Sequence, residues 1–340
     1  MKLTHTQGDD AIVATGLTKR YGATRALDGF DLRVPIGTVC GLLGPNGAGK
    51  STAVRILSTL LRADGGSAQV AGADVAKNPR AVRRRIGLSG QAPAVDEILS
   101  GRQNLVLFAR LGGLDKARAK ARASELLDQF GLTDTGNKAV KHYSGGMRRR
   151  LDLAVTLILS PAVLFLDEPT TGLDPANRNE VWSAIRALVT GGTTVLLTTQ
   201  YLDEADQLAD NIVVLDGGKQ IAEGTPDELK SGVGGDQLDV VLEDARDLDV
   251  AERVLARVAS GAVEITLDAR RVSAPVADRV AAATRLLRGL EHERIAVADV
   301  DLRRPTLDDV FLRLTGHTTV PEPDPEPRGR RTDSSAEVAA

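Results

Sequence analysis

The chain has 340 residues, a net charge of −3 and a hydrophobic content of 42%. This length allows about two domains, and the composition is typical of ordinary globular cores. The small net charge gives no indication of nucleic-acid binding. The single cysteine, Cys40, excludes an intrachain disulfide, and we interpret it as a small buried residue in a reducing cytosol.

The sequence predicts neither a signal peptide nor a membrane-spanning helix. The first ten residues, MKLTHTQGDD, contain no apolar stretch. No run reaches the ~18 apolar residues that a spanning helix needs, because the nearest candidate, residues 153–166, contains Thr156, Ser160 and Pro161. We therefore expect any role at a membrane to depend on a partner protein.

The first predicted elements are strands, and they lie within residues 11–34. Phe30, Leu32 and Val34 alternate with glycine or charged residues, which is the period of a half-buried strand. Residues 39–43, VCGLL, form a short apolar run that is typical of a fully buried strand.

Residues 44–52 read GPNGAGKST and fill every fixed position of the phosphate-binding pattern G-x-x-x-x-G-K-[ST]. Glycines let backbone N–H groups turn toward an anion, Lys50 can reach the β- and γ-phosphates, and the Ser51 hydroxyl can hold Mg²⁺. A glycine-rich surface turn is the alternative, but the strand before the loop and the helical apolar spacing after it favour a nucleotide site. The predicted binding residues of this loop are Gly44, Pro45, Asn46, Gly47, Ala48, Gly49, Lys50, Ser51 and Thr52.

The segments that follow alternate between helices and buried strands. Residues 70–92 contain a short strand, a basic helix and a second strand, and residues 93–160 are mainly helical. Residues 163–166 and 193–198 are apolar or β-branched runs, which indicates a parallel sheet covered by helices on both faces. Residues 212–224 are predicted to form a hairpin.

Two further motifs carry chemistry. In VLFLDEP, residues 163–169, Asp167 ends a buried strand, where its carboxylate can approach Mg²⁺ bound at Ser51. Glu168 comes next and can polarise or orient an attacking water as a general base.

The second motif is HYSGGMRRR, residues 142–150. Ser144 can cap the helix that follows, and Gly145 and Gly146 leave its first N–H groups accessible. We expect Arg148, Arg149 and Arg150 on the polar side of that helix.

In identity, order and spacing these motifs resemble those of the ATP-binding subunits of ABC transporters over residues 11–230. The resemblance implies an α/β P-loop NTPase of the ABC type, with a RecA-like core, an antiparallel β subdomain and a helical subdomain near residues 93–160. It also implies ATP and Mg²⁺ as cofactors, and ATP hydrolysis carried by Lys50, Glu168 and Gln200.

The resemblance assigns roles to six further residues outside the phosphate loop. Tyr21 corresponds to the aromatic residue that stacks on adenine. Gln91 falls where the family's Q-loop glutamine senses Mg²⁺ and contacts the membrane partner. Asp174, in TGLDP, corresponds to the D-loop near the dimer seam, and Ser144, Gly145 and Gly146 correspond to the signature that binds the nucleotide of the other copy.

Gln200 is a departure from the family, which usually has a histidine at this position to hold the γ-phosphate. A glutamine amide still donates a hydrogen bond but cannot be protonated near pH 7. Gln200, the following YLDEAD and residues 303–317 are similar to the antibiotic-exporter branch that handles daunorubicin and doxorubicin. We therefore interpret the glutamine as a feature of that branch.

The resemblance also implies partners. Two copies face each other head to tail as a homodimer with ATP between them, and they work with two copies of an integral membrane permease. The expected location is the cytoplasmic side of the cell membrane, as a peripheral protein. We expect the permease to dock in a groove around Gln91 and residues 93–99.

A second, smaller domain is predicted after the ATP-binding domain. Its pattern is βαββαβ, which is typical of a ferredoxin-like α+β fold, and it closes with a helix bearing Leu307, Val310, Phe311 and Leu314 at helical spacing. The expected division is an N-terminal tail 1–10, an ATP-binding domain 11–230, a linker 231–236, an accessory domain 237–317 and a disordered tail 318–340.

Three alternatives stay open at this point. One keeps the transporter role with a lipid, polysaccharide or peptide as cargo, since the ATPase subunit does not hold the cargo. Another is a soluble ABC ATPase without a permease, although only one phosphate loop and no long coiled coil are present. The third is a regulatory module that does not hydrolyse ATP, which the presence of Glu168 disfavours.

Overall fold

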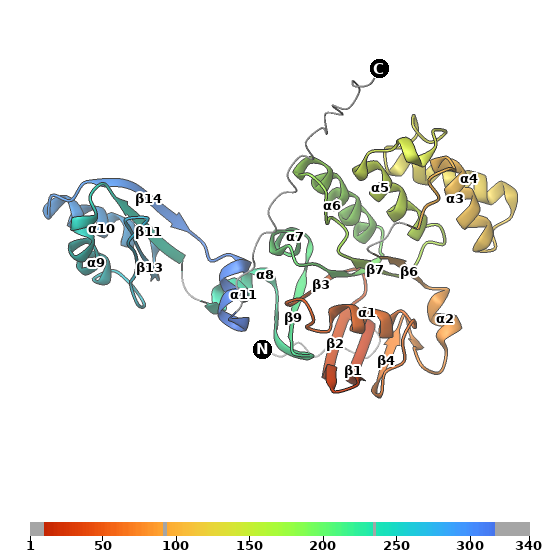
Figure 1. Ribbon diagram of the computed structural model, residues 1–340, viewed down its shortest axis with the longest axis horizontal. Coiled ribbons are helices and arrows are strands. Elements are labelled where there is room, and N and C mark those ends of the chain that lie inside the picture. Colours follow the sequence, from red (N-terminus) through yellow and green to blue (C-terminus); the bar gives the residue numbers. More distant parts are fainter. Residues whose placement is uncertain (1–9, 91–93, 234–235, 317–340) are drawn as a thin grey trace, which may run out of the picture.

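The computed structural model describes residues 10–90, 94–233 and 236–316 (Figure 1). Within these residues the strands form three sheets. A six-stranded sheet and a four-stranded antiparallel sheet build the larger N-terminal part. A second four-stranded sheet builds the C-terminal part.

The six-stranded sheet forms the centre of the N-terminal part. Its strands are β3 (Val39–Leu43), β6 (Ile86–Ser89), β7 (Val163–Asp167), β8 (Thr194–Thr198), β9 (Asn211–Asp216) and β10 (Lys219–Gly224). Their order is β10-β9-β3-β8-β7-β6, with parallel pairing everywhere except in the β9–β10 hairpin. The predicted parallel sheet and the predicted hairpin are both confirmed.

Helices cover both faces of this sheet, because alternate side chains of its strands are apolar on either side. Val163 and Phe165 of β7 belong to a cluster on the side of α1 (Lys50–Leu57), whereas Leu164 and Leu166 belong to a cluster on the side of α6 (Pro175–Thr190). Figure 1 shows α1 and α6 on opposite sides of the sheet. A short helix, α7 (Leu202–Leu208), follows β8.

The antiparallel sheet covers the α1 side. It consists of β1 (Asp10–Tyr21), β2 (Thr24–Pro35), β4 (Gly65–Val70) and β5 (Ala73–Asp74), in the order β2-β1-β4-β5, and is followed by α2 (Pro79–Arg83). Phe30, Leu32 and Val34 of β2 are buried, as their alternation predicted. Helix α1 ends at Leu57, and Leu60 in the turn after it is 63% exposed.

Three helices form the predicted helical region. They are α3 (Gly101–Leu111), α4 (Lys116–Gln129) and α5 (Gly145–Thr156), with a 3₁₀ turn at Val140–His142. Each helix begins where the side chain of Ser100, Asp115 or Ser144 accepts a hydrogen bond from a first-turn backbone amide. Among all the described helices, none combines the length and apolar character needed to cross a bilayer.

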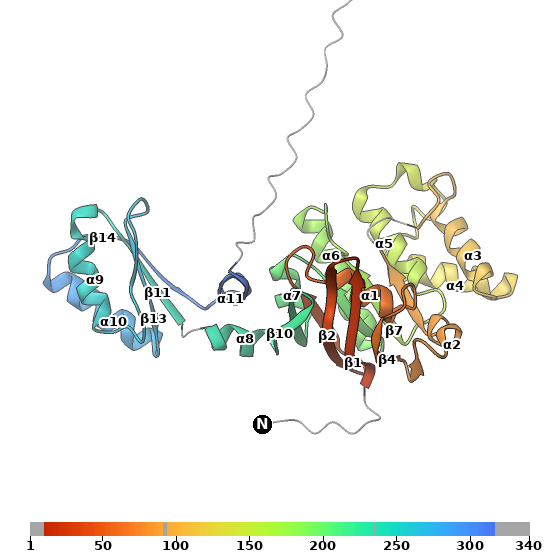
Figure 2. The same ribbon diagram turned by 60° about the horizontal axis from the view of Figure 1, so that its bottom comes forward.

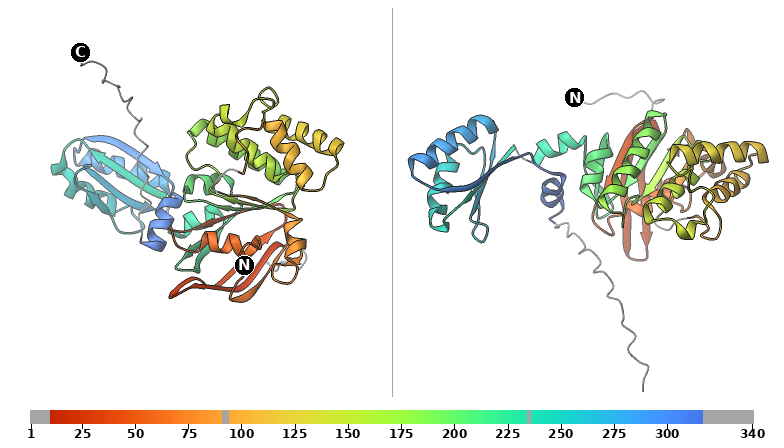
Figure 3. Two further views of the ribbon diagram at one scale, coloured as in Figure 1. Left: turned by 45° about the vertical axis from the view of Figure 1, so that its right-hand side comes forward. Right: turned by 90° about the horizontal axis from the view of Figure 1, so that it is seen from above.

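The C-terminal part contains the predicted βαββαβ unit. After α8 (Pro226–Val233), its elements are β11 (Asp236–Leu242), a 3₁₀ turn (Ala245–Asp247), α9 (Leu248–Ala256), β12 (Glu264–Thr266), β13 (Arg271–Val276), α10 (Arg279–His292) and β14 (Val297–Arg303). The strands form one antiparallel sheet in the order β12-β13-β11-β14, and α9 and α10 bury their apolar sides against it. Figures 2 and 3 show this unit beside the ATP-binding part, joined to it through α8 and the segment after β14.

The closing helix, α11 (Leu307–Thr315), buries its apolar residues in a cluster of the ATP-binding part and not in the cluster of the accessory sheet. Its buried residues Leu307, Val310 and Phe311 share a cluster with residues of α7 and the β9 strand of the central sheet. Helical spacing predicted the apolar stripe, but it could not show which surface the stripe covers. After α8 the chain therefore passes from the ATP-binding part into the βαββαβ unit, and α11 then packs against the ATP-binding part again.

Arg303 connects the accessory sheet to the returning helix. Its Nε donates to Asp239 Oδ2 in β11 at 3.0 Å, and its Nη1 donates to Asp309 Oδ2 in α11 at 2.9 Å. Asp309 also completes a capping box with Thr306 at the start of α11. The lowered pKa of Asp309, in which hydrogen bonds from Thr306 and the charge of Arg303 outweigh burial, agrees with a carboxylate held in its charged form.

We predict that Phe311→Ala releases α11 from the ATP-binding part. The ring is 6% exposed, and loss of a buried phenylalanine side chain typically costs about 3–5 kcal/mol. Hydrogen exchange should accelerate in α11 and also in α7, which shares its cluster.

Leu314→Ala is the matched control, since Leu314 lies on the same helix but is 39% exposed. It should change the free energy of opening by less than about 1 kcal/mol. Equal exchange rates in both variants would contradict the docking of α11.

Candidate nucleotide-binding site

The phosphate loop connects β3 to α1, and three of its glycines have positive φ angles. The φ angles of Gly44, Gly47 and Gly49 are 153°, 84° and 111°. A Cβ atom on Gly44 would collide with the carbonyl oxygen of Leu215, and one on Gly49 would collide with that of Ala26. Both positions therefore require glycine for conformation and for close backbone approach. No side chain of the described residues caps α1, so its first N–H groups can bind an anion.

Lys50 begins α1, and its ammonium is held inside the loop. Its Nζ donates to the carbonyl oxygen of Gly44 at 2.6 Å and to that of Pro45 at 3.0 Å, and the residue is 7% exposed. Burial lowers the pKa of Lys50, whereas the charges of Glu168 and Asp167 oppose this shift. A buried cation needs anionic partners, and a triphosphate would provide them.

Asp167 lies at the same edge of the sheet as the phosphate loop. It ends β7 and pairs with Thr198 of β8, which in turn pairs with Leu42 just before the loop. The Thr198 hydroxyl donates to Asp167 Oδ1. Ser51 is exposed in the first turn of α1.

This donor set fits Mg²⁺, which prefers hard oxygen ligands and is usually held by one or two carboxylates together with phosphates. Within the described residues, no group of three or more His, Cys, Asp or Glu side chains could hold a metal ion. An ion between Ser51 and Asp167 would therefore depend on the phosphate oxygens of the nucleotide.

Glu168 follows Asp167 in an unusual backbone conformation. Its φ angle is 50°, and its N–H donates to the carbonyl oxygen of Thr198 at 2.9 Å. Its carboxylate accepts a long hydrogen bond from the Thr171 hydroxyl at 3.4 Å. Because this is its one side-chain hydrogen bond among the described residues, the backbone conformation sets the direction in which the carboxylate points. Half-buried at the end of β7, the carboxylate is suited to polarise a water beside the nucleotide.

Gln200 and Tyr21 are both exposed. Gln200 comes two residues after the end of β8, so the parallel register brings it to the edge where Asp167 and the loop lie. Tyr21 ends β1 opposite Thr24, is 48% exposed, and has Lys19 Nζ 5.9 Å from its ring centroid. Stacking of its ring on adenine stays a prediction.

The signature residues lie away from Lys50, because α5 packs on the face of the central sheet opposite to α1. Ser144 caps α5 by accepting from the Met147 amide at 3.2 Å, as predicted. A Cβ atom on Gly146 would collide with the side chain of Asn177, whose backbone N–H donates to Asp174 Oδ1 at 3.0 Å. The signature and Asp174 are therefore tied together through Asn177.

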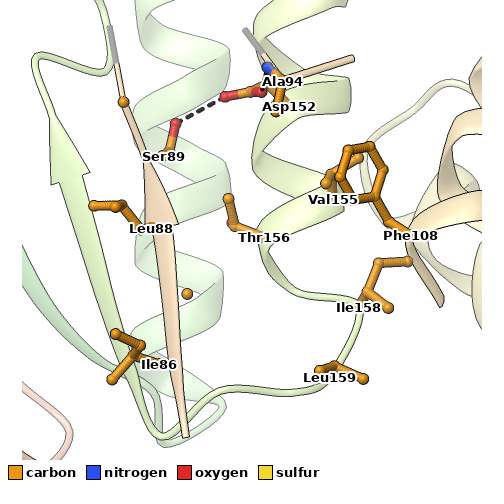
Figure 4. Close-up of a pocket in the computed structure, with 12 residues that line it drawn as sticks. Ile86, Leu88, Ser89, Ala94, Phe108, Asp152, Val155, Thr156, Ile158 and Leu159 are labelled. Carbon is orange, nitrogen blue, oxygen red and sulfur yellow. Dashed lines mark hydrogen bonds between the residues drawn. The ribbon is translucent and has the colours of Figure 1, made fainter. Parts of the chain in front are cut away.

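A cavity of about 270 Å³ lies between β6 and α5, and Figure 4 shows its side chains. Gln91 itself is outside the described residues, but Gly90 and Ala94, on either side of it, line this cavity. The remaining lining is mainly apolar, with Ser89 and Asp152 at one end: Ile86, Leu88, Phe108, Val155, Ile158 and Leu159.

Comparison with known proteins decides the family. A family model described as ABC transporter matches residues 27–171, and one described as ATP-binding protein DrrA1-3-like, C-terminal domain, matches residues 224–315. Daunorubicin resistance ATP-binding protein DrrA2 of Streptomyces coeruleorubidus is 63% identical over 309 residues, which cover 91% of this chain and 96% of that protein. The chain belongs to the ATP-binding subunits of ABC transporters, in their daunorubicin/doxorubicin-resistance branch.

Two further relatives agree. Daunorubicin/doxorubicin resistance ATP-binding protein DrrA of Streptomyces peucetius is 53% identical over 92% of this chain and 94% of its own length. Among solved structures, cbiO1 of Clostridium perfringens, part of the ABC transporter complex cbiONQ, is 27% identical with a TM-score of 0.62 over 66% of this chain and 91% of that chain.

Membership in this family makes the chain an ABC-type ATPase that binds ATP. ABC ATP-binding subunits work with membrane permeases and dimerise. The fold predicted from the motifs, including the α+β C-terminal part, is confirmed.

One expectation for the ABC signature helix is wrong. Arg149 was expected on the polar side of α5 but is 8% exposed. Arg149 lies between Arg148 and Arg150 in the sequence, and both of these neighbours are partly exposed. Carbonyl groups from loops distant in sequence surround its guanidinium, and local periodicity carries no information about them.

A buried carboxylate next to the nucleotide site was also missed. Glu204, in α7, is fully buried and accepts hydrogen bonds from the Thr170 hydroxyl at 2.8 Å and from Trp182 Nε1 at 3.1 Å. Thr170 lies two residues after Glu168, so Glu204 joins the segment after Gln200 to the segment after β7. Burial raises the pKa of Glu204, and hydrogen bonds from Thr170 and Trp182 oppose the shift.

We predict a pH-dependent fluorescence change from Trp182, the only tryptophan in the sequence. The pKa of Glu204 is higher in the folded state than in the unfolded state. Its protonation therefore contributes fully to the free energy of unfolding at a pH below the unfolded-state pKa. That contribution is lost as the pH rises through the folded-state pKa. Trp182, whose Nε1 donates to this carboxyl, should report the deprotonation.

Glu204→Gln keeps an acceptor for both donors and removes the ionisation. The fluorescence transition should disappear, and the stability of the variant relative to the native protein should increase with pH. Glu180→Gln is the control, since Glu180 lies on the same helix as Trp182 but pairs with Arg150 at the surface. Persistence of the transition in Glu204→Gln would refute the assignment.

Proposed function

We propose that the chain is the ATP-hydrolysing subunit of an exporter that removes a hydrophobic, anthracycline-like antibiotic through a separate membrane permease. The observation that supports this cargo is the extent of similarity to the daunorubicin-resistance subunits, which includes the C-terminal part as well as the ATPase motifs. In this proposal the protein is peripheral on the cytoplasmic side of the membrane. Residues 11–230 and the βαββαβ unit act as separate domains.

The proposed working form is a head-to-tail homodimer with two permease copies. Each chain carries two anion-binding helix starts, at Lys50 in α1 and at Ser144 in α5, on opposite faces of one sheet. They do not form a single site within one chain. Two copies would complete two sites, in which ATP held by Lys50 of one chain meets Ser144, Gly145 and Gly146 of the other.

The hydrolytic site is proposed to combine Lys50, Glu168 and Gln200. Ser51 and Asp167, with Gln91, would hold Mg²⁺, which neutralises charge on the β- and γ-phosphate oxygens. Lys50 binds the phosphates, and Glu168 accepts a proton from the attacking water. Gln200 can donate a hydrogen bond to the γ-phosphate but adds no positive charge, so more of the electrostatic stabilisation rests on Lys50.

The cavity beside β6 is the proposed docking site for a cytoplasmic helix of the permease. Its lining is mainly apolar, and Leu159 at its rim is 45% exposed. On the neighbouring helix α3, Leu111 is 74% exposed and Leu107 is 42% exposed, which extends the apolar surface. An amphipathic helix is the partner that such a groove suits.

We predict that Glu168→Gln binds ATP but stalls hydrolysis and accumulates an ATP-bound dimer. The amide keeps the shape of the side chain but cannot accept the proton, so turnover should fall by about 10²–10⁴-fold. Size-exclusion chromatography with and without ATP would detect the dimer. Lys50→Ala is the control that should lose both hydrolysis and the ATP-dependent dimer. Normal turnover in Glu168→Gln would show that Glu168 is not a catalytic residue.

We predict that Leu159→Glu prevents co-purification with the permease partner while basal ATPase activity is kept. A charge at the groove rim would have to be desolvated on docking. Leu60→Glu is the matched control, since Leu60 is exposed but does not line the groove. ATPase assays of the complex against anthracyclines, lipids and peptides would then identify the cargo, and stimulation by lipids or peptides alone would contradict the antibiotic assignment.

A further inference from the structure

Arg149 is an arginine of the signature helix whose side chain points into the protein. It is 8% exposed, and three of its hydrogen-bond acceptors are backbone carbonyl oxygens. Nε donates to Pro169 at 2.6 Å, Nη1 to Gly90 at 3.1 Å, and Nη2 to Glu168 at 3.4 Å. The guanidinium therefore spans from the end of β6 to the two residues after β7.

Within the part of the chain that the structure describes, one carboxylate forms an ion pair with Arg149. Asp152, one turn further along α5, lies with Oδ2 3.4 Å from Arg149 Nη1, and its side chain is more deeply buried than that of Arg149. Asp152 also accepts from the Ser89 hydroxyl at 2.8 Å and from the Ala94 amide at 2.9 Å. Figure 4 shows Ser89, Asp152 and Ala94 together at one end of the groove. Arg149 is thus held in place by residues on both sides of Gln91.

The backbone that Arg149 holds is the part that directs Glu168. Glu168 has a φ angle of 50°, a conformation that side-chain-bearing residues adopt only where their surroundings enforce it. Its N–H donates to the Thr198 carbonyl, and its own carbonyl accepts long hydrogen bonds from Arg149 Nη2 and from the Thr171 amide, both at 3.4 Å. Among the described residues its carboxylate has only the long bond from Thr171, so the direction of the side chain depends on this backbone.

We propose that Arg149 is a positioning residue for ATP hydrolysis, which sets the direction of the Glu168 carboxylate by clamping the carbonyl groups of Glu168 and Pro169. This inference rests on the proposed role of Glu168 as the general base. The clamp requires donors in a planar fork, which a lysine ammonium cannot reproduce. It also provides a physical connection from the permease groove to the hydrolytic residue, through Ala94 and Ser89, Asp152 and Arg149.

The test is steady-state ATP hydrolysis by the full-length chain carrying Arg149→Lys. The buried charge is kept and the fork is lost, so kcat should fall by ~10-fold or more while KM for ATP stays within ~2-fold. Arg150→Lys is the matched control. Arg150 lies on the same helix, donates to the Phe130 carbonyl at 3.1 Å and pairs with Glu180 at 3.2 Å, so its variant should keep native kcat.

A double-mutant comparison separates positioning from general loss of structure. If Arg149 acts through Glu168, adding Arg149→Lys to Glu168→Gln should lower the residual single-turnover rate by less than ~2-fold. The proposal would be overturned if the rate of the double variant fell by the product of the two single losses. It would also be overturned if Arg149→Lys kept native kcat while Glu168→Gln lost hydrolysis. If Glu168→Gln itself turns over normally, the proposed general base fails instead.

A thermal melt shows whether Arg149→Lys is folded. If it melts well below the native protein, the measurement is made on Arg149→Gln with Asp152→Asn, a pair that leaves no unmatched buried charge. The same loss of kcat with unchanged KM is expected there. Native kcat in this pair would overturn the proposal.

Discussion

The close packing of the phosphate loop against two neighbouring backbone segments is the constraint on which the rest of the site depends. Gly44 lies against Leu215 of β9, and Gly49 lies against Ala26 of β2. The turn after β9 reinforces this arrangement, because the Gly218 amide donates to the Ala48 carbonyl at 3.0 Å and the Gly218 carbonyl accepts from the Asp28 amide at 2.9 Å. These contacts hold the loop between the parallel and the antiparallel sheet. Its backbone amides are therefore fixed before any nucleotide binds.

Parallel strand pairing then brings the other reactive groups to the loop. Thr198 pairs with Leu42 on one side and with Asp167 on the other, so the ends of β3, β8 and β7 are level. Residues that follow these three strands, namely the loop, Gln200 and Glu168, must emerge at one edge of the sheet. This geometry explains why motifs more than a hundred residues apart in sequence can serve one phosphate group.

The sequence predicted the features that depend on local pattern, and it could not predict those that depend on distant partners. Glycines at fixed spacing, apolar runs and a serine before two glycines were sufficient for the loop, the parallel strands and the cap of α5. Arg149 was misplaced because its environment is built from carbonyls of Gly90 and Pro169, which belong to other segments. The same reason applies to α11, whose apolar stripe is evident from spacing although its contact with α7 is not.

The short helix α7 contacts both parts of the chain close to the candidate nucleotide-binding site. Seven residues are too few for a helix to be stable by itself in water, so the position of α7 depends on its neighbours. On one side Glu204 is bonded to Thr170 and Trp182, and on the other Leu202 and Ala205 pack in the cluster of α11. Gln200 lies two residues before the start of this helix, so its position depends on the contacts that α7 makes with the segment after Glu168 and with α11. A change in either contact would shift Gln200, which we propose as a hydrogen-bond donor to the γ-phosphate.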